Sequence, residues 1–350
     1  MRLEELDFDL PEEAIAQRPA RPRDSSRLMC LTADGDVKHA VFSDLPDLLR
    51  PGDALVRNDS RVLPARMMVR KPTGGEVEVL FLRPVTSQTG EAGDRWEVLA
   101  RASKRVRAGG ELVLPGGEVL RVDEELGGGR WSVSGPGRPS LIELMETYGS
   151  LPLPPYVKGS PDDASVYQTV YARELGSAAA PTAGLHFTDD LLDRLKARGV
   201  AICSLTLHVG SDTFLPIREK VVEEHRIHSE AYKVPARTVE GLRETRSRGG
   251  RVVAVGTTVT RVLETLGHGG LSVDDQAQGH RKGFAHMFIT PGHQFKVVDL
   301  LVTNFHLPRS TVLALAMAFA GKDRLLQAYQ TALANGYRFF SFGDAMLIER

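Results

Sequence analysis

The chain is poor in cysteine, and this limits the kinds of site that it can build. Cys30 and Cys203 are its two cysteines, they lie far apart in the sequence, and they form no CxxC pair. The sequence therefore predicts neither a disulfide framework nor a zinc site. Two small buried thiols in a reducing cytosol are expected instead.

Long apolar runs are missing as well. No stretch reaches the roughly 18 apolar residues that a membrane-spanning helix needs. The opening MRLEELDFDLPEE is acidic, whereas a secretory signal begins with basic residues followed by an apolar run. We therefore expect a cytoplasmic protein with no membrane segment.

Several well-known catalytic and nucleotide-binding motifs are also absent. The chain has no GxGxxG after a strand pattern and no GxxxxGKS or GxxxxGKT, so neither a dinucleotide fingerprint nor a P-loop is indicated. It has no GxSxG, and no cysteine stands near a histidine-rich motif, which disfavours an acyl-transfer hydrolase.

The chain has no excess of charge of either sign, since its formal net charge is −1. Charge alone therefore does not indicate nucleic-acid binding, and any such site must be a local patch. Three basic clusters are candidates, although each could equally be a solvated surface. They are Arg18, Arg21, Arg23 and Arg27; Lys104, Arg105 and Arg107; and Arg243, Arg246, Arg248 and Arg251.

The composition, at 42% hydrophobic and 25% charged residues over 350 positions, is that of a globular protein with room for two domains. Residues 61–150 contain short runs rich in Val and Leu between glycine turns, which predict a small antiparallel β-barrel or sandwich. A β-like stretch at Leu28–Leu31 and a helix start at Pro11 precede this segment.

After residue 150, strand and helix patterns alternate, which predicts an α/β domain with a parallel or mixed sheet, or a barrel-like arrangement of the same units. We therefore expect an α/β domain made of residues 1–60 and 151–350, with residues 61–150 inserted as an all-β domain. The segment Gly269–Lys282 is expected to be a loop. The predicted strands are 200–210, 251–256 and 299–308, and the predicted helices are 189–199, 239–250, 258–267, 310–321 and 322–336.

Polar side chains gather where the predicted strands end, which is where open α/β sheets usually bind ligands. Small residues in Ala178–Thr188 let backbone approach a ligand, although the same segment could be a tight turn capped by Thr188. His208 ends an apolar strand, and Asn304 and His306 alternate with apolar neighbours so as to share one face. Gly256 precedes a helix start whose free N–H groups could bind an anion, although simple capping is the alternative.

The segment His225-Arg-Ile-His228-Ser-Glu230 could ligate a metal, but its spacing matches no strong zinc pattern. Hydrogen bonding or acid–base chemistry suits its histidines better, because histidine titrates near neutral pH. The residues alone thus predict a two-domain enzyme with a pocket of Asn, Thr and His side chains, and they do not define a reaction.

The sequence nevertheless resembles the S-adenosylmethionine:tRNA ribosyltransferase-isomerase family of queuosine biosynthesis. The similar stretches run in the family's order along nearly the whole chain, and include GDALVRNDSRVLPAR, GSAAAPTAGLHFT, TLHVG, HRIHSE, AVGTT, TNFHLPRST and YRFFSFGDAMLI. The chain departs from the family pattern at Ser211–Asp212, at Val259–Thr260 and at Phe284–His286, and no role is carried over onto the last segment.

The resemblance implies that the enzyme transfers and isomerises the ribosyl part of S-adenosylmethionine onto 7-aminomethyl-7-deazaguanine at the tRNA wobble position. Epoxyqueuosine is the implied product, adenine and methionine leave, and S-adenosylmethionine is consumed as a cosubstrate. No metal is implied, and a monomer is expected. Two alternatives stay open: a metal-dependent hydrolase that uses His225, His228 and Glu230, and a non-catalytic tRNA-binding protein.

The resemblance also suggests roles for single residues. The candidate acids, bases and polar partners in catalysis are His186, His208, His306 and Asp344. The candidate S-adenosylmethionine contacts are Thr182, Gly184, Phe187, Gly256, Thr257, Thr258, Asn304 and Phe305, of which Phe187 and Phe305, together with Phe214, offer aromatic faces to the sulfonium. The candidate tRNA contacts are Arg23, Arg27, Asn58, Arg61, Arg66, His225 and His228.

Overall fold

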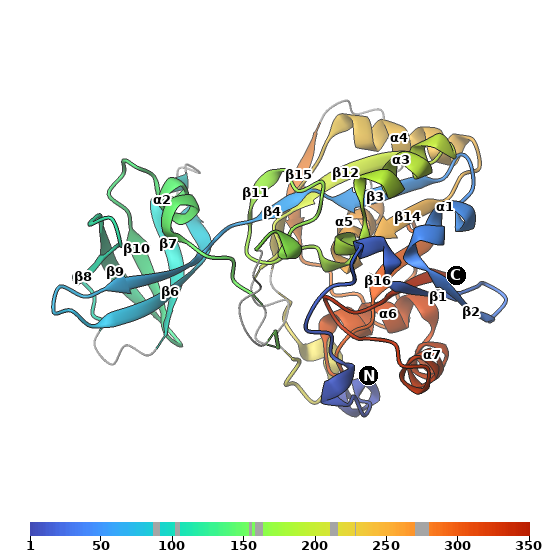
Figure 1. Ribbon diagram of the computed structural model, residues 1–350, viewed down its shortest axis with the longest axis horizontal. Coiled ribbons are helices and arrows are strands. Elements are labelled where there is room, and N and C mark those ends of the chain that lie inside the picture. The colour runs from blue at the N-terminus through green and yellow to red at the C-terminus, as the bar shows by residue number, and fades with distance from the viewer. Residues whose placement is uncertain are drawn as a thin grey trace.

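The computed structural model describes residues 1–86, 92–101, 106–153, 156–157, 164–210, 216–227, 229–269 and 280–350. A nine-stranded mixed sheet forms the larger part of the protein (Figure 1). The neighbours β12, β3, β14 and β16 are parallel to one another, whereas β17 pairs antiparallel with β16 and parallel with β1. The outermost pairs at both edges are antiparallel. In spatial order the strands are β15 (Arg281–Ala285), β13 (Glu230–Val234), β12 (Ala201–Leu207), β3 (Ala54–Asn58), β14 (Val252–Val255), β16 (Leu300–Asn304), β17 (Ala345–Glu349), β1 (Arg27–Leu31) and β2 (Val37–Val41).

Helices cover both faces of this sheet, because successive residues of each central strand point to opposite sides. Leu55 of β3 belongs to one apolar core, and its neighbour Val56 belongs to the other. The core on the Leu55 side includes residues of α1 (Leu45–Leu48) and α3 (Asp189–Ala197). The core on the Val56 side includes residues of α4 (Ala236–Ser247), α5 (Thr257–His268), α6 (Thr311–Ala320) and α7 (Lys322–Ala334).

A closed six-stranded antiparallel barrel lies beside the main sheet (Figure 1). Alternating apolar residues such as Val77, Val79 and Phe81 fill its interior, and α2 (Leu141–Tyr148) contributes Leu144 and Met145 to the same core. The barrel strands are β5 (Arg66–Arg70), β6 (Glu76–Thr86), β7 (Ala92–Arg101), β8 (Glu111–Val113), β9 (Val119–Gly127) and β10 (Arg130–Ser134).

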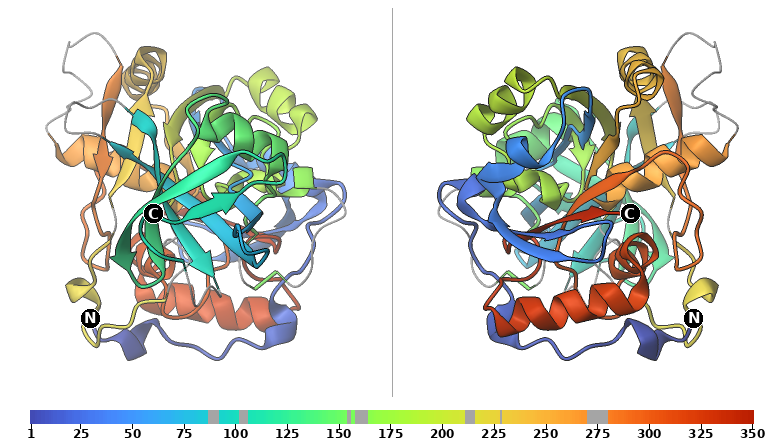
Figure 2. Two further views of the ribbon diagram at one scale, coloured as in Figure 1. Left: turned by 90° about the vertical axis from the view of Figure 1, so that its left-hand side faces the viewer. Right: turned by 90° about the vertical axis from the view of Figure 1, so that its right-hand side faces the viewer.

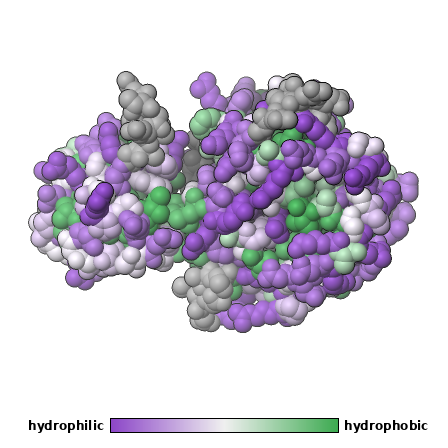
Figure 3. Space-filling model, turned by 90° about the horizontal axis from the view of Figure 1, so that it is seen from above, coloured by the Kyte–Doolittle hydropathy of each residue, from purple (hydrophilic) through white to green (hydrophobic). Residues whose placement is uncertain are grey.

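A parallel pair of short strands lies between the barrel and the main sheet (Figure 1). These are β4 (Ser60–Val62), which leads toward the barrel, and β11 (Glu174–Ser177), on the returning chain. The barrel faces the viewer on the left of Figure 2, with the main sheet and its helices behind it. Hydrophilic residues cover much of the two lobes on the face drawn in Figure 3, whereas hydrophobic residues are exposed at the narrow part between the lobes.

The expected fold class, an α/β main part with an antiparallel β-barrel, is confirmed. The predicted strands and helices after residue 188 are all present, with shifts of a few residues at their ends. Two local expectations are wrong. Pro11 precedes a single 3-10 turn, Glu12–Ala14, instead of a helix, and the segment expected to be a loop up to Lys282 already contains the start of β15. Residues 270–279 of that segment lie outside the described residues.

Other expectations concern termini and thiols. Thr188 caps α3 as predicted, because its hydroxyl accepts a hydrogen bond from the Leu191 N–H at 3.2 Å. Both cysteines are free and buried. Within the described ranges, no helix is long and apolar enough to span a bilayer.

Candidate active site

Two adjoining pockets lie around the first turn of α5, at the carboxyl ends of β14 and β16. Thr257, Thr258 and Val312 line both pockets. The first, here called the Asn304 pocket, is lined on its other side by Thr182, Thr303, Asn304, His306 and Phe340. The second, here called the Glu230 pocket, is lined by Gly210, His225, Glu230, Arg261 and Phe288. This is the edge at which an open α/β sheet binds ligands.

The start of α5 gives the two pockets a shared source of positive potential. Gly256 has a φ of 90° and occupies the N-cap position, so no side chain caps the helix. The first N–H groups of a helix have no partner within it, and the helix dipole makes this end favourable for an anion. The expected helix start at Thr257–Thr258 is therefore confirmed, and these residues line the pockets.

His186 lies behind the Asn304 pocket in a buried chain of hydrogen bonds. Its Nδ1 is 2.8 Å from Ser26 Oγ, and its Nε2 is 3.0 Å from Asn304 Nδ2. An amide nitrogen can only donate, so Nε2 accepts from Asn304 and Nδ1 carries the proton that is donated to Ser26. Burial lowers the pKa of His186 to about 3, so the ring is neutral at neutral pH.

This chain fixes the orientation of the Asn304 amide. Its Nδ2 also donates to the Phe340 carbonyl at 3.2 Å, which leaves Oδ1 directed at Thr182 Oγ1, 3.4 Å away. The carbonyl oxygen of Asn304 and the Thr182 hydroxyl are thus held together in the pocket wall. His186 does not line the pocket itself, and both of its ring nitrogens have partners.

His306 does line the Asn304 pocket, although it lies beyond the end of β16. Its Nε2 is 2.9 Å from Thr303 Oγ1, and its backbone N–H donates to the Tyr329 hydroxyl at 2.9 Å. Burial lowers the pKa of His306 to about 3. The structure thus brings Asn304 and His306 into one wall, as expected.

His208 lies apart from both pockets. Its ring packs over Gly176 of β11, where an added Cβ would lie 2.8 Å from the ring. Burial lowers the pKa of His208, and the carboxylates of Glu174 and Asp59 partly offset that effect. The structure therefore does not place His208 with His186 and His306. Its neighbours Val209 and Gly210 reach the pockets instead.

Asp344 is occupied by its own fold and not by the pockets. Its Oδ1 accepts from the Arg27 N–H at 3.0 Å, and its Oδ2 accepts from the Arg338 N–H at 2.8 Å. The Arg338 guanidinium adds an ion pair at 3.3 Å. The buried carboxylate thus ties the start of β1 to the last turn of the chain, and the expected contact of Asp344 with an amine or a ribose hydroxyl stays a prediction.

The two aromatic faces expected for the sulfonium are also displaced. Phe187 and Phe305 are both fully buried in apolar cores, and neither lines a pocket. Gly184 packs against Tyr171, whose hydroxyl would lie 2.1 Å from an added Cβ, so its lack of a side chain serves packing. The pocket walls do not favour the expected contacts of these three residues with S-adenosylmethionine, which stay predictions. The aromatic residue that lines the Asn304 pocket is Phe340, which sequence reasoning missed.

Phe340 adopts a φ of 73°, which is strained for a residue with a side chain. Its N–H donates to the Phe305 carbonyl at 3.0 Å, and its own carbonyl accepts from Asn304. The segment RFFSFGD carried no sign of this conformation in its letters, because a left-handed phenylalanine is held by tertiary contacts and not by local preference.

A buried ion pair forms the floor of the Glu230 pocket. Arg261 Nη1 is 2.5 Å from Glu230 Oε2, and the rest of its guanidinium donates to the carbonyls of Met287 and Ala285. The other Glu230 oxygen accepts from the Gly210 N–H at 2.9 Å. The pair joins α5 to β13 and β15, and neither residue was assigned a site role in the favoured sequence reading.

His225, expected to contact tRNA, lies in the wall of the Glu230 pocket instead. Its Nδ1 is 2.8 Å from Glu219 Oε2, and this contact lowers the pKa of Glu219. A histidine oriented by a carboxylate is the arrangement of many general bases. His228 and Phe214 lie outside the described residues.

The remaining expected tRNA contacts differ in how accessible they are. Asn58 is buried and bonds to Leu207 and Ser60, which does not favour a tRNA contact there. Arg61 is half-exposed beside Glu146, and Arg66 is partly buried at the start of the barrel. Arg23 and Arg27 donate to the carbonyls of Gln168 and Asn335, both at 2.6 Å.

The basic clusters also differ. In the third cluster, Arg246, Arg248 and Arg251 form ion pairs with Asp299, Glu244 and Asp53, so that much of its charge is neutralised. Lys104 and Arg105 of the second cluster lie outside the described residues.

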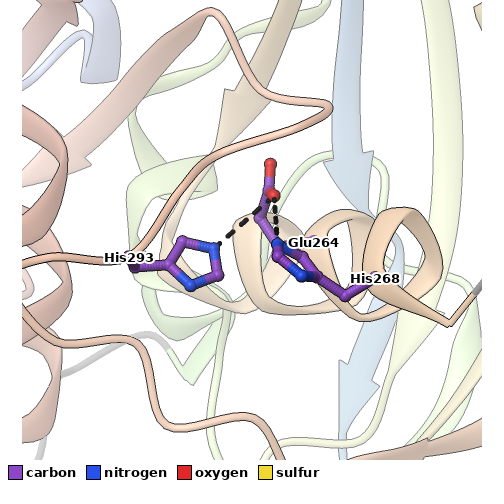
Figure 4. Close-up of side chains that lie close together, drawn as sticks. All are labelled: Glu264, His268 and His293. Carbon is purple, nitrogen blue, oxygen red and sulfur yellow. Dashed lines mark ion pairs between the residues drawn. The ribbon is translucent and has the colours of Figure 1, made fainter.

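One group of side chains within the described ranges has the spacing of metal ligands: Glu264, His268 and His293 (Figure 4). The two imidazoles approach the carboxylate at 3.9 and 3.6 Å. The carboxylate, however, already accepts three backbone N–H groups from residues 296–298 at 2.8–3.0 Å, and His268 Nε2 lies 3.0 Å from the Gln294 carbonyl. The group therefore holds this loop against α5, and none of its three residues lines either pocket.

Together these features define an α/β enzyme whose pocket lies at a sheet edge and whose second part is a β-barrel. Residues 3–348 match the model of the family described as queuosine biosynthesis protein, and the chain belongs to that family.

Named relatives cover the chain from end to end. A Rubrobacter xylanophilus protein called S-adenosylmethionine:tRNA ribosyltransferase-isomerase is 50% identical over 349 residues, which is 99% of this chain and 98% of the relative. A protein of the same name from Anaeromyxobacter sp. strain K is 51% identical over 354 residues, 100% of both chains. The crystal structure of S-adenosylmethionine tRNA ribosyltransferase from Thermotoga maritima is 38% identical, covers 98% of this chain and 99% of its own, and has a TM-score of 0.56.

Proposed function

We propose that this protein is an S-adenosylmethionine:tRNA ribosyltransferase-isomerase. It moves the ribosyl part of S-adenosylmethionine onto 7-aminomethyl-7-deazaguanine in the wobble position of tRNA, gives epoxyqueuosine, and releases adenine and methionine. The observation that carries this proposal is the match of residues 3–348 to the queuosine biosynthesis family, together with relatives of that name at about half identity over the full chain.

The chemistry of the two pockets fits S-adenosylmethionine as a substrate. The free N–H groups at the start of α5 suit its carboxylate, and Glu230 offers a carboxylate oxygen in the same pocket for its ammonium group. Across the shared wall, Thr182 and the Asn304 carbonyl offer hydrogen bonds to ribose hydroxyls. The Phe340 ring suits the cationic sulfonium or the purine.

The histidines take separate roles in this proposal. The carbon next to a sulfonium is acidic, so a neutral imidazole in the pocket wall can accept its proton. His306 and His225 line the pockets and are the candidates for this step. His186 is a positioning residue, because both of its nitrogens are engaged and it acts through Asn304.

The larger unit carries the chemistry and the barrel assists with tRNA. The proposed division places residues 1–60 and 151–350 in the catalytic α/β domain and residues 61–150 in the inserted all-β domain. The wobble base must leave its stack to enter a pocket at the sheet edge, as in other enzymes that act on bases. The protein acts as a cytoplasmic monomer that needs no metal.

Incubation with S-adenosylmethionine and tRNA bearing 7-aminomethyl-7-deazaguanine tests the proposal. Adenine and methionine are expected to appear in equal amounts, and only when the modified tRNA is present. Absence of adenine release would favour the non-catalytic tRNA-binding alternative.

The metal-dependent hydrolase is less favoured, because Glu230 is paired with Arg261 and His225 is bonded to Glu219. Metal analysis of the purified protein tests it directly, since a stoichiometric transition metal whose removal abolishes activity would support that alternative.

A further inference from the structure

A basic cleft lies outside both pockets, along the part of β12 that β13 does not cover. It is lined by Arg57 and Asp59 of the β3–β4 segment, Tyr171 and Arg173, Ser204 of β12, and Arg237 and Thr238 at the start of α4. None of these residues lines the Asn304 pocket or the Glu230 pocket. The cleft opens to solvent, and Arg237 is exposed.

The charges in this cleft do not balance. Asp59 is the one acidic residue among those that line it, and both of its carboxylate oxygens are engaged. Oδ1 accepts from the Thr206 hydroxyl at 2.7 Å, and Oδ2 pairs with Arg173 Nη2 at 2.9 Å. Within the described part of the chain, no ion pair engages Arg57 or Arg237. Two guanidinium groups thus face the cleft with an excess of positive charge.

Arg57 is held in place without an ion pair in the described part of the chain, although the carboxylates of Asp59 and Asp189 attract it from a distance. Its Nε donates to Ser204 Oγ at 3.2 Å, and its guanidinium carbon lies 4.2 Å from the centre of the Tyr171 ring. Burial lowers the pKa of Arg57, which reflects the cost of keeping a cation in a half-buried position. An anion supplied from outside would offset this cost, and a planar guanidinium suits the oxygens of a phosphate.

The position of α4 adds to the same potential. Arg237 and Thr238 belong to its first turn, where the helix dipole favours an anion, although the Thr238 N–H already donates to the Pro235 carbonyl at 2.9 Å. The Thr238 hydroxyl donates to the Ser204 carbonyl at 2.6 Å, which fixes the helix end against β12 beside Arg57. The arginine side chains and the helix dipole therefore both favour an anionic ligand in this cleft.

We propose that this cleft binds a backbone phosphate of the tRNA substrate. The identity of the ligand as tRNA rests on the function proposed above, whereas the preference for phosphate rests on the cleft alone. Tyr171 connects the two regions: its ring packs under Arg57 on one side and lies 6.3 Å from the ring of Phe187 on the other. Phe187 ends the turn η6 (Thr182–His186), whose first residues line the Asn304 pocket. The cleft is thus connected to the wall of the Asn304 pocket through the packed rings of Tyr171 and Phe187.

Substitution of the two unpaired arginines tests the proposal. Arg237→Gln is exposed and should not affect folding, and Arg57→Gln, alone and combined with it, removes the second charge. Arg248→Gln is the matched control, because Arg248 lies at the other end of the same helix and pairs with Glu244. Equilibrium binding of tRNA is measured over a range of salt concentrations without S-adenosylmethionine, and steady-state kinetics are measured with both substrates.

We expect Arg237→Gln to weaken tRNA binding about tenfold and to reduce the salt-dependence slope by about 1, with the double variant weaker still. The KM for S-adenosylmethionine and kcat at saturating tRNA should stay within about twofold of the wild type, and Arg248→Gln should change nothing. Unchanged tRNA affinity and salt slope in Arg237→Gln and in the folded double variant would overturn the proposal.

Two further results separate this proposal from its neighbours. Suppose that binding of inorganic phosphate is lost when the two arginines are substituted, whereas tRNA affinity is unaffected by the same substitutions. The cleft then binds a free anion, and the proposal is wrong. If the wild type binds tRNA but releases no adenine, the enzymatic function fails, whereas the binding measurements still decide the role of the cleft.

Discussion

The buried chain Ser26–His186–Asn304 offers the sharpest test of how the pocket is built. His186→Phe keeps a ring against Phe42, whose centroid lies 5.0 Å from that of His186, but it removes both hydrogen bonds. The Ser26 hydroxyl and one Asn304 N–H are then left without these partners in a buried environment. Each such loss costs about 1–3 kcal/mol, so the two together should lower the free energy of unfolding by roughly 2–6 kcal/mol.

The effect on catalysis follows from the freed Asn304 amide. Its carbonyl oxygen is no longer held toward Thr182, and loss of such a supporting residue typically costs 10- to 100-fold. We expect kcat/KM to fall about 100-fold in His186→Phe. His186→Gln restores an acceptor for Asn304 and should recover most of this loss, because a positioning role needs a hydrogen bond and not a titrating ring.

Steady-state adenine release by His186→Phe, Asn304→Ala and the double variant provides the readout. The two losses should be strongly non-additive, since His186 acts through Asn304. His39→Phe is the control, because His39 also bonds a side-chain hydroxyl, that of Tyr337, but lines neither pocket. Additive losses, or a His186→Gln variant as inactive as His186→Phe, would refute the reasoning and favour direct proton transfer by His186.

The other predictions concern stability. The two buried histidines have a folded pKa of about 3, below the unfolded value, so stability is complete above pH 6.5 and falls as the unfolded chain takes up protons below it. Between pH 7 and pH 5 we expect the free energy of unfolding to fall by roughly 2 kcal/mol for each histidine. In urea unfolding, His306→Gln should therefore reduce this pH dependence by the contribution of one histidine. Glu230→Gln should lower the free energy of unfolding by about 3–5 kcal/mol, because it leaves Arg261 buried without its counter-charge. The double variant Glu230→Gln/Arg261→Met should lose less stability in thermal unfolding. Equal losses in the two variants would argue against a buried ion pair. Gly184→Ala should destabilise strongly because its Cβ would meet the Tyr171 hydroxyl, whereas Gly75→Ala in the barrel should be neutral.

Much of the architecture could be predicted from the sequence, because periodicity is a local property. The alternating strand and helix patterns after residue 188 and the helix start at Thr257 are visible in the letters, and so is the glycine-punctuated barrel. The spatial order of the strands in the sheet could not be predicted in this way. Residues from the two ends of the chain pair in it, as β1 does with β17, and such pairing depends on contacts between distant segments.

Only part of the site could be predicted, because some of its residues are marked by local sequence patterns and others depend on tertiary contacts. Asn304 and His306 were found because polar residues in a buried strand need partners, and both line the pocket. The burial of Phe187 and Phe305 could not be predicted, since an aromatic residue near a polar motif can face a core as easily as a ligand. The partners of Asp344, the backbone N–H groups of Arg27 and Arg338, could not be predicted because tertiary folding brings them to it.

The fate of the ribose carbons tests the central claim most directly. S-adenosylmethionine labelled with ¹³C throughout its ribose is incubated with the protein and tRNA that bears 7-aminomethyl-7-deazaguanine, and the digested tRNA is analysed by mass spectrometry. The account predicts that all of the labelled ribose carbons appear in a single epoxyqueuosine nucleoside, with one adenine released for each. Adenine release with no label in the tRNA, or labelled tRNA formed without loss of adenine, would contradict it.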